Sequence, residues 1–471
     1  MSALAAELIG AGEIGELVVD LEISRAWLVD PASGREGPGE LVVTDGHIEA
    51  VNWLSGDDAE GIDDRGIVVA PGFVDLHAHF REPGHEDAET ITSGLAAAAH
   101  GGFTTVCLMP DTTPTLDEPS VLARVRAAAA ASGSPVEVLA YGAVSANRSG
   151  ATLAALGELA DAGVVGFSEG DSPVRAANLL RSALAYAGML GLPIVDHPED
   201  VSQTDGAEAN DGLPATVLGL RGAPASAEAA MVARDLAILA DVVSDVAGAR
   251  LHLTHLSTAA ALELVRAAKA AGLPVTCDVA PHHLALTDDW LAGWRRFAWE
   301  RAWTPGADVE AAPYETSLRV SPPLRSAADA AACRAALADG TADAIATDHA
   351  PLTSVDKDVE FGLASAGISG IETALGTLLA AVDAAELTLG RAIASLTIGP
   401  ARVLGGRWPR VPPGLVEGAP ADLVVFDRAD RWTVTPESIA TKGKNSPLLG
   451  RALPGRDLVT VAGGRLAYSA G

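Results

Sequence analysis

The chain is 471 residues long, which exceeds one small domain and suits a large domain with an accessory one. It carries 32 basic and 62 acidic residues, a formal net charge of −30, so we expect no general binding to nucleic acid or to anionic membranes. Hydrophobic residues make up 48% of the chain and charged residues 20%, which indicates a folded protein with a sizeable core.

The cysteines and the first residues bear on location. Cys107, Cys277 and Cys333 lie far apart and form no CxxC pair, which favours buried thiols in a reducing compartment over disulfides. Residues 1–16 have no basic stretch before their apolar residues, so the sequence predicts no signal peptide. Charged residues interrupt the apolar stretches before they reach the ~20 residues that span a bilayer. We therefore expect a cytoplasmic protein.

Residues 1–70 come first in the chain and hold short alternating segments, such as 39–44, separated by turn residues. This pattern is typical of β-strands. Residues 406–471 show it again in the segments 421–426 and 458–462. Two β-rich ends around a different middle predict one small β-sandwich domain built from both termini.

The middle of the chain, residues 71–405, alternates short apolar runs with Ala-rich amphipathic stretches. The expected strands are 72–77, 104–108, 136–142, 164–167, 193–197, 251–255, 275–279 and 344–347. The clearest helical patterns span 118–131, 176–190, 225–246 and 258–271. Eight such strand–helix units predict an α/β fold, a parallel (β/α)8 TIM barrel. A doubly wound open sheet is the alternative, but no GxGxxG follows the first strand.

Polar side chains gather at the C-terminal ends of these strands, where such a barrel keeps its active site. His77 and His79 end the first strand and, being two apart, share a face, so both can ligate one metal ion. Further strands end at His197, His255 and Asp348. Four imidazoles and a carboxylate at one rim predict a divalent metal site. The set suits zinc, with manganese, iron or cobalt as alternatives.

Eight motifs, in this order, resemble those of the dihydroorotases of the class I type, within the amidohydrolase superfamily. The first is PGFVDLHAHFREPG at 71–84, around His77 and His79. The others are GGFTTVCLMP at 101–110, DHPED at 196–200, PHHL at 281–284, PPLR at 322–325, ATDHAP at 346–351, GIET at 370–373 and KGKNSP at 442–447. The motifs cover nearly the whole chain, so the resemblance implies the family's fold and activity.

The implied activity is the reversible, metal-assisted interconversion of N-carbamoyl-L-aspartate and dihydroorotate in pyrimidine synthesis. By the same resemblance the metal ligands are His77, His79, His197, His255 and Asp348. Asp348 would also be the general acid/base, since a carboxylate within hydrogen-bond reach can move a proton to the leaving nitrogen. Arg81 would bind the substrate carboxylate, a task that suits a planar, two-pronged guanidinium.

One expected metal ligand is missing from the sequence. The family places a metal-bridging aspartate after the fourth strand, and counting back from His197 puts Gly170 at that position. Glu169 or Asp171 could substitute, but neighbours on an extended segment point to opposite faces. The sequence leaves open which of them does so, and whether one or two ions bind.

Several positions around the substrate also depart from the family pattern. Asp111 and Ser321 stand where asparagines are expected, and Leu352 stands where a histidine is expected. A Phe-Gly pair that usually offers backbone groups to the ring aligns with Ala366 and Gly367. Each lost hydrogen bond to a charged group costs ~1.5–3 kcal/mol, so activity would be weak unless other residues compensate.

Three hypotheses therefore stand. The first is a working zinc dihydroorotase. The second is a hydrolase of a related ureide or hydantoin, although those relatives usually carry a carboxylated lysine that the segment 163–174 lacks. The third is a catalytically silent chain that supports a partner such as aspartate transcarbamoylase. We expect a small-molecule substrate and a homodimer.

A few other residues have weaker assignments. His252 and His349 are expected to lie next to the site residues and to hold them in place without binding the metal. One ring of the pair His282 and His283 is expected to face the pocket. His85 and His100 are expected at the surface. We further expect the segment 352–361, with Lys357 as its cation, to close over substrate, and the tryptophans of 288–316 to pack on the barrel. The latter residues are Trp290, Trp294, Trp299 and Trp303.

Overall fold

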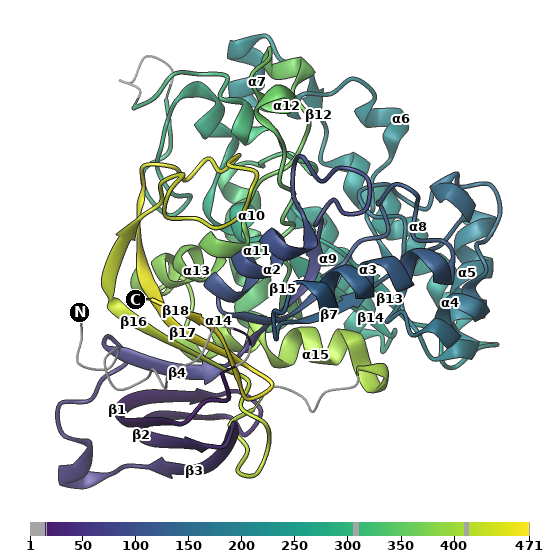
Figure 1. The fold of residues 1–471 in the computed structure, drawn as a ribbon. Coiled ribbons are helices and arrows are strands. Elements are labelled where there is room, and N and C mark those ends of the chain that lie inside the picture. Colours follow the sequence, from purple (N-terminus) through teal and green to yellow (C-terminus); the bar gives the residue numbers. More distant parts are fainter. Residues whose placement is uncertain (1–14, 16, 305–309, 409–413, 471) are drawn as a thin grey trace.

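The computed structural model describes residues 15, 17–304, 310–408 and 414–470, which form a barrel beside a β-sheet (Figure 1). The N-terminal segment for which the sequence predicts no signal peptide lies, apart from Gly15, outside the described residues. None of the described helices combines the length and apolar character needed to cross a membrane.

The barrel consists of short parallel strands. They are β5 (Phe73–Ala78), β6 (Phe103–Leu108), β7 (Glu137–Ala140), β8 (Gly142–Ala143), β9 (Phe167–Ser168), β10 (Ile194–Asp196), β13 (Leu251–Leu253), β14 (Val275–Val279) and β15 (Ala344–Ile345). β7 and β8 continue each other across Tyr141, so the described segments occupy eight positions around the ring. The ring closes where Ala78 pairs in parallel with His349. The predicted barrel is confirmed.

Helices surround the strands. They are α2 (Ile91–His100), α3 (Pro119–Ala131), α4 (Leu156–Ala162), α5 (Ala177–Leu190), α6 (Val201–Thr204), α7 (Leu213–Leu218), α8 (Ser226–Val242), α9 (Ala259–Ala270), α10 (Pro281–Ala285), α11 (Ala327–Asp339), α12 (Ser354–Lys357), α13 (Ala374–Asp383), α14 (Leu389–Leu396) and α15 (Ile398–Leu404). The four clearest helical patterns of the sequence correspond to α3, α5, α8 and α9. A further pair of very short strands, β11 (Ala209–Asn210) and β12 (Gly222–Ala223), lies between β10 and α8.

Two apolar clusters hold the barrel. One lies between strands and helices, and α2 contributes Leu95, Ala97 and Ala98 to it. The other joins residues of strands on opposite sides of the ring, such as Val74 of β5 and Val195 of β10, and these can meet only inside the barrel. Helix α15 belongs to this inner cluster and closes the end of the barrel where the strands begin. The open, polar end is therefore at the C-terminal ends of the strands.

Strands from both ends of the chain form one sheet. They are β1 (Leu21–Asp30), β2 (Arg35–Thr44), β3 (His47–Trp53), β4 (Ile67–Pro71), β16 (Leu423–Thr433), β17 (Ala452–Ala462) and β18 (Arg465–Ser469). Their order is β18-β17-β16-β4-β1-β2-β3, and β4 pairs with β16 antiparallel. The accessory domain from both termini is confirmed, but hydrogen bonds join it into one continuous sheet instead of the two sheets of a sandwich.

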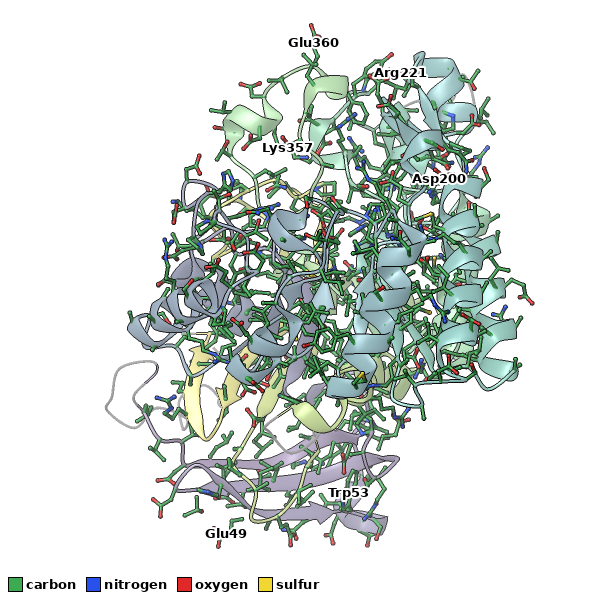
Figure 2. All side chains as sticks on the ribbon, turned by 90° about the vertical axis from the view of Figure 1, so that its right-hand side faces the viewer. Glu49, Trp53, Asp200, Arg221, Lys357 and Glu360 are labelled. Carbon is green, nitrogen blue, oxygen red and sulfur yellow. The ribbon has the colours of Figure 1, made fainter. Side chains whose placement is uncertain are left out.

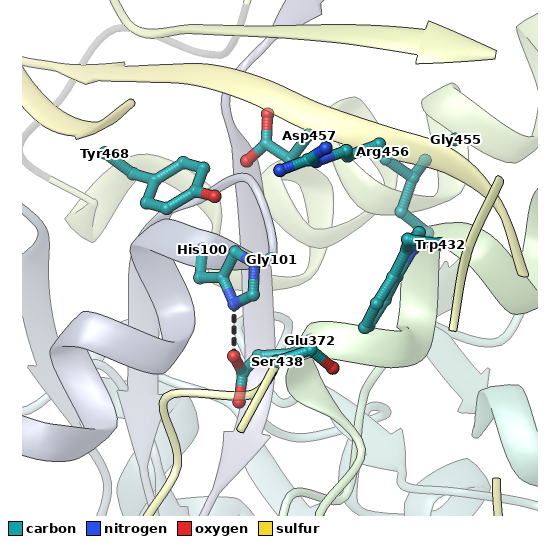
Figure 3. Close-up of a pocket in the computed structure, with 10 residues that line it drawn as sticks. His100, Gly101, Glu372, Trp432, Ser438, Gly455, Arg456, Asp457 and Tyr468 are labelled. Carbon is teal, nitrogen blue, oxygen red and sulfur yellow. Dashed lines mark hydrogen bonds and ion pairs between the residues drawn. The ribbon is translucent and has the colours of Figure 1, made fainter. Parts of the chain in front are cut away.

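A cavity of about 180 Å³ lies where this sheet meets the barrel (Figure 3). Trp432, Asp457 and Tyr468 line it from the sheet, and His100 and Glu372 line it from the barrel. His100 is 20% exposed and forms an ion pair with Glu372. The prediction that His100 is a surface residue is therefore wrong, because the terminal sheet covers the end of α2. His85 is exposed, as expected.

Candidate metal centre

Four buried histidines from three parts of the barrel meet at its open end. The ring centres of His79 and His77 are 4.9 Å apart, those of His77 and His255 4.8 Å, and those of His255 and His197 4.7 Å. All four side chains are at most 1% exposed. The strand ends thus bring together the four histidines that the sequence predicts as ligands.

The ring nitrogens face one another in two pairs. His77 Nε2 is 3.1 Å from His79 Nε2, and His197 Nδ1 is 3.4 Å from His255 Nε2. Two ligands held about 2.05 Å from a tetrahedral ion are ~3.3 Å apart, so each pair has the spacing of two ligands on one ion. Burial lowers the pKa of His77 and of His255, which favours the neutral, metal-binding form of both rings.

Two carboxylates complete the group. Asp171 Oδ1 lies 3.0 Å from His79 Nε2 and 3.4 Å from His77 Nε2, and Asp348 Oδ1 lies 3.9 Å and 3.8 Å from the same atoms. The potential ligand atoms of these four residues lie within 4.8 Å of one another. Imidazole nitrogens and carboxylate oxygens at this spacing suit a divalent ion, so the residues fit the metal that the strand ends predict.

The carboxylate next to the histidines belongs to Asp171 and not to Glu169. Gly170 has φ +63°, which turns the chain between its two neighbours. Glu169 points the other way, where its Oε1 accepts a hydrogen bond from the Ser145 N–H (2.6 Å). Of the two substitutes that the sequence leaves open, the structure thus brings only Asp171 into contact with the histidines.

The charges of this group compete for protons. Burial raises the pKa of Asp348 well above its ordinary value, and the nearby Asp171 adds to the effect. Burial lowers the pKa of His79, but the carboxylates of Asp111 and Asp171 outweigh it and raise the value to about 10. The Asp348 carboxyl and the His79 ring therefore favour their protonated forms here, and a divalent cation would displace these protons on binding.

Asp111 bridges a predicted ligand and a predicted substrate contact. Its Oδ2 lies 2.8 Å from His79 Nδ1 and 3.0 Å from Arg81 Nη1. The pKa of the Asp111 carboxyl is lowered, because attraction from His79 and Arg81 exceeds the opposing effect of burial. The structure therefore shows Asp111 holding the two side chains. Arg81 also donates a hydrogen bond from its Nε to the carbonyl oxygen of Pro351 (3.3 Å).

The remaining predicted substrate residues line two cavities. Arg81 and Leu352 line one of about 600 Å³. Ser321 and Ala366 line another of about 140 Å³, together with Glu199, whose Oε2 is 3.5 Å from His197 Nε2. Sequence reasoning missed Glu199, although it stands two residues after His197 in the motif DHPED.

Gly367 lies against Leu352. A Cβ on Gly367 would come within 2.8 Å of Ala350 O and 3.2 Å of Leu352 Cδ1, and its φ of +148° suits glycine. Its N–H donates to Arg319 O (2.9 Å), and its carbonyl accepts from Asn445 Nδ2 (2.9 Å). Glycine is therefore required here by close packing, and its backbone groups already have partners.

Three other histidines stand around the ligand group. His349 is turned away from it, and its Nδ1 accepts from the Gly370 N–H (3.2 Å). His252 is buried and its Nε2 lies 2.7 Å from Asp278 Oδ2. His282 is also buried, and its Nε2, 3.9 Å from Asp348 Oδ2, has no hydrogen-bond partner among the described residues. His282 is thus the ring of the Pro281-His282-His283 motif that faces Asp348.

The segment after Asp348 is anchored at Lys357. Lys357, which ends α12, lies with Glu360 at the end of the molecule opposite to Trp53 of the sheet (Figure 2). Its side chain is buried, and Nζ donates to the carbonyls of Thr316 (3.0 Å), Arg319 (3.2 Å) and Ser365 (2.7 Å). These three bonds occupy the ammonium group, so Lys357 does not face a substrate in this structure, and closure of the segment 352–361 stays a prediction. Of the tryptophans expected to pack on the barrel, Trp299 packs against the barrel core and Trp290 shares an apolar cluster with Ala285 of α10. Trp294 and Trp303 instead pack with Ala292 of their own segment.

Known proteins are similar in sequence to most of this chain. A family model described as Dihydro-orotase-like matches residues 66–261. The dihydroorotase of Anaeromyxobacter dehalogenans is 46% identical over 451 residues, which cover 95% of this chain and 98% of that protein. The dihydroorotase of Pelotomaculum thermopropionicum is 42% identical over 449 residues, again with 95% and 98% covered.

Solved structures share the fold at lower identity. The L-hydantoinase (dihydropyrimidinase) from Arthrobacter aurescens has a TM-score of 0.78 with this chain, at 23% identity and with 96% of both chains covered. A D-hydantoinase structure has a TM-score of 0.74 at 22% identity, with 95% of this chain and 94% of that chain covered. At this identity the likeness shows the barrel and the sheet beside it.

Proposed function

Because this chain belongs to the dihydroorotase family of the amidohydrolase superfamily, we propose that it interconverts N-carbamoyl-L-aspartate and (S)-dihydroorotate. It is a metal-dependent hydrolase of a cyclic amide C–N bond. The observation that carries the proposal is the convergence of His77, His79, His197, His255 and Asp348 at one end of the barrel. In pyrimidine synthesis the reaction closes the ring of dihydroorotate.

The family implies a divalent metal, and we propose zinc as the native ion. His77, His79 and Asp348 would hold one ion, with Asp171 beside them, and His197 and His255 would hold a second. The paired spacings of 3.1 Å and 3.4 Å support two sites. When bound, such an ion lowers the pKa of water to about 7 and polarises the carbonyl that is attacked.

The chain's own residues then handle the proton and the substrate. Asp348 is buried beside the histidines, where its carboxylate can take up a proton and return it to the ring nitrogen. Arg81 lies 14% exposed at the wall of the larger cavity. Its Nη2 has no hydrogen bond to a described residue, so this edge of the guanidinium can bind the substrate carboxylate.

The residues that depart from the family pattern offer fewer contacts to a substrate, but the metal ligands and Asp348 are retained. Leu352 offers no hydrogen bond, and Asp111 is already bonded to His79 and Arg81. Glu199 and Ser321 share the smaller cavity and provide polar groups there. We expect a slower enzyme with a raised KM, and not a silent one, since nothing structural requires the full ligand set.

Further assignments rest on the same family membership. We propose that the metal-binding barrel spans residues 71–405 and that residues 1–70 and 406–471 form the accessory domain. We also propose a cytoplasmic homodimer that can associate with aspartate transcarbamoylase. A ureide or hydantoin hydrolase is the second candidate, favoured by Leu352, whose apolar side chain suits a less anionic substrate.

The deciding experiment measures dihydroorotate formation from N-carbamoyl-L-aspartate by the full chain loaded with zinc. We expect a rate well above the uncatalysed control, lost on chelation and absent in Asp348→Ala. Parallel assays with hydantoin and allantoin test the second candidate. A folded, metal-loaded protein without turnover of carbamoyl-aspartate would overturn the proposal, and co-purification of a partner would then favour the supporting role.

A further inference from the structure

A buried carboxylate behind the histidines contacts both pairs. Asp278, near the end of β14, is fully buried. Its Oδ1 accepts a hydrogen bond from the backbone N–H of His255 (2.5 Å), and its Oδ2 lies 3.2 Å from Thr254 Oγ1. Thr254 Oγ1 in turn lies 3.1 Å from His77 Nδ1. One side chain therefore reaches the backbone of one histidine and, through a hydroxyl, the ring of another.

The donors and acceptors fix the direction of these bonds. An ionised carboxylate only accepts, so the Thr254 hydroxyl donates to Asp278 and its oxygen accepts from the His77 Nδ1–H. A neutral imidazole has a single N–H. Once Nδ1 carries it, the lone pair lies on Nε2, the atom that faces His79 and Asp171. The bonds thus select the tautomer of His77 that a metal requires.

The backbone contact has a separate effect. His255 has φ +37°, in the left-handed region that residues other than glycine rarely adopt. Such a conformation persists only where neighbouring groups hold it. The bond from the His255 N–H to Asp278 is one such restraint, and it sets where the ring of His255 meets that of His197. His252 Nε2 lies 2.7 Å from Asp278 Oδ2, the same carboxylate oxygen that faces Thr254, and helps to hold it in place.

We infer that Asp278 is a positioning residue of the metal centre, which sets the tautomer of His77 through Thr254 and the backbone of His255 directly. The inference rests on the proposed function in so far as His77 and His255 are taken as ligands. Groups that orient metal ligands in this way typically change metal affinity 10- to 100-fold when removed. Asp278 would therefore affect both ion sites without touching either ion.

Asp278→Asn tests this with no change in side-chain size. The amide oxygen of asparagine stays opposite the His255 N–H, so its NH2 group stands at the Oδ2 position and donates to Thr254 Oγ1. The hydroxyl proton of Thr254 then turns toward His77 Nδ1. The proton of His77 would then lie on Nε2, where it blocks the metal. Thr254→Val removes the hydroxyl at similar shape and breaks the same chain of bonds, whereas Thr254→Ser keeps it.

The readout is zinc binding by the full chain, measured by competition with a chromogenic chelator, together with the visible spectrum of the Co²⁺-substituted protein. We expect Asp278→Asn and Thr254→Val to bind zinc at least tenfold more weakly and to alter the Co²⁺ spectrum. Thr254→Ser should bind as the wild type does. Asp457→Asn is the matched control, because Asp457 is also buried and accepts from a threonine hydroxyl, Thr460 Oγ1 (2.9 Å), in the terminal sheet.

Wild-type zinc affinity in Asp278→Asn, or equal weakening in Asp457→Asn, would overturn the inference. So would full binding by Thr254→Val. If Asp278→Asn fails to fold, the contrast between Thr254→Val and Thr254→Ser still decides. Failure of the proposed function is a different result, because the wild type itself would then show no turnover or no zinc binding.

Discussion

Replacing Asp171 with asparagine should weaken metal binding, because this carboxylate faces the ring nitrogens of His77 and His79 at 3.4 Å and 3.0 Å. The substitution keeps the size of the side chain and removes its negative charge. A bond to a charged group contributes ~1.5–3 kcal/mol, which corresponds to about 10- to 100-fold in affinity for the ion. Turnover of carbamoyl-aspartate should fall with metal occupancy and recover in part at high zinc concentration.

The control is Glu169→Gln, two positions away. Glu169 accepts from the Ser145 N–H, and the amide oxygen of glutamine can accept the same bond. We expect unchanged metal content by mass spectrometry after dialysis against a chelator of known affinity. The reasoning is refuted if Glu169→Gln loses metal while Asp171→Asn retains it, since the chain reversal at Gly170 would then not select the ligand.

Three further outcomes are expected. Arg81→Lys should raise KM for carbamoyl-aspartate about 10- to 100-fold with a smaller change in kcat, since an ammonium lacks paired donors; an unchanged KM in steady-state assays contradicts this. Lys357→Met should lower the free energy of unfolding by ~1–3 kcal/mol in denaturant titrations, because three carbonyl oxygens lose the donor that Lys357 supplies. An unchanged denaturation midpoint would show that water replaces the lost ammonium donor. Burial raises the pKa of Asp457 from 3.8 to about 7, so the folded state disfavours its ionised form, and stability is lost as pH rises from about 4 to 7. Asp457→Asn should therefore gain more in Tm, relative to the wild type, at pH 8 than at pH 5, and a gain independent of pH would argue against this.

Local patterns in the sequence predict the positions that depend on strand geometry. His77 and His79 are two apart on a strand, so their shared direction follows from the backbone alone. His197, His255 and Asp348 follow strands of one parallel barrel, and the fold then places them at the same end. For these five residues, secondary structure and topology together are enough.

The remaining features depend on contacts between distant segments. The choice of Asp171 over Glu169 is made by the turn at Gly170, whose φ cannot be read from residue types. Asp278 and Thr254 acquire their roles only from atoms on neighbouring strands. The local sequence predicts that His100 is an exposed helix end. The strands within residues 423–469, more than 300 positions later in the chain, cover it in the structure.

The pairing of β4 with β16 also acts on the unfolded states of the barrel. Pro71 lies opposite Leu423, so the pairing joins the two ends of a segment of about 350 residues that contains every barrel strand. While the sheet persists, a barrel that opens remains a closed loop instead of a free chain. Closing a loop of that length costs on the order of 5 kcal/mol of conformational entropy, which the opened barrel cannot recover. The terminal sheet thus works as a non-covalent cross-link that suppresses partial unfolding of the barrel, in addition to the contacts that Val424, Phe426 and Ala462 make in the barrel core.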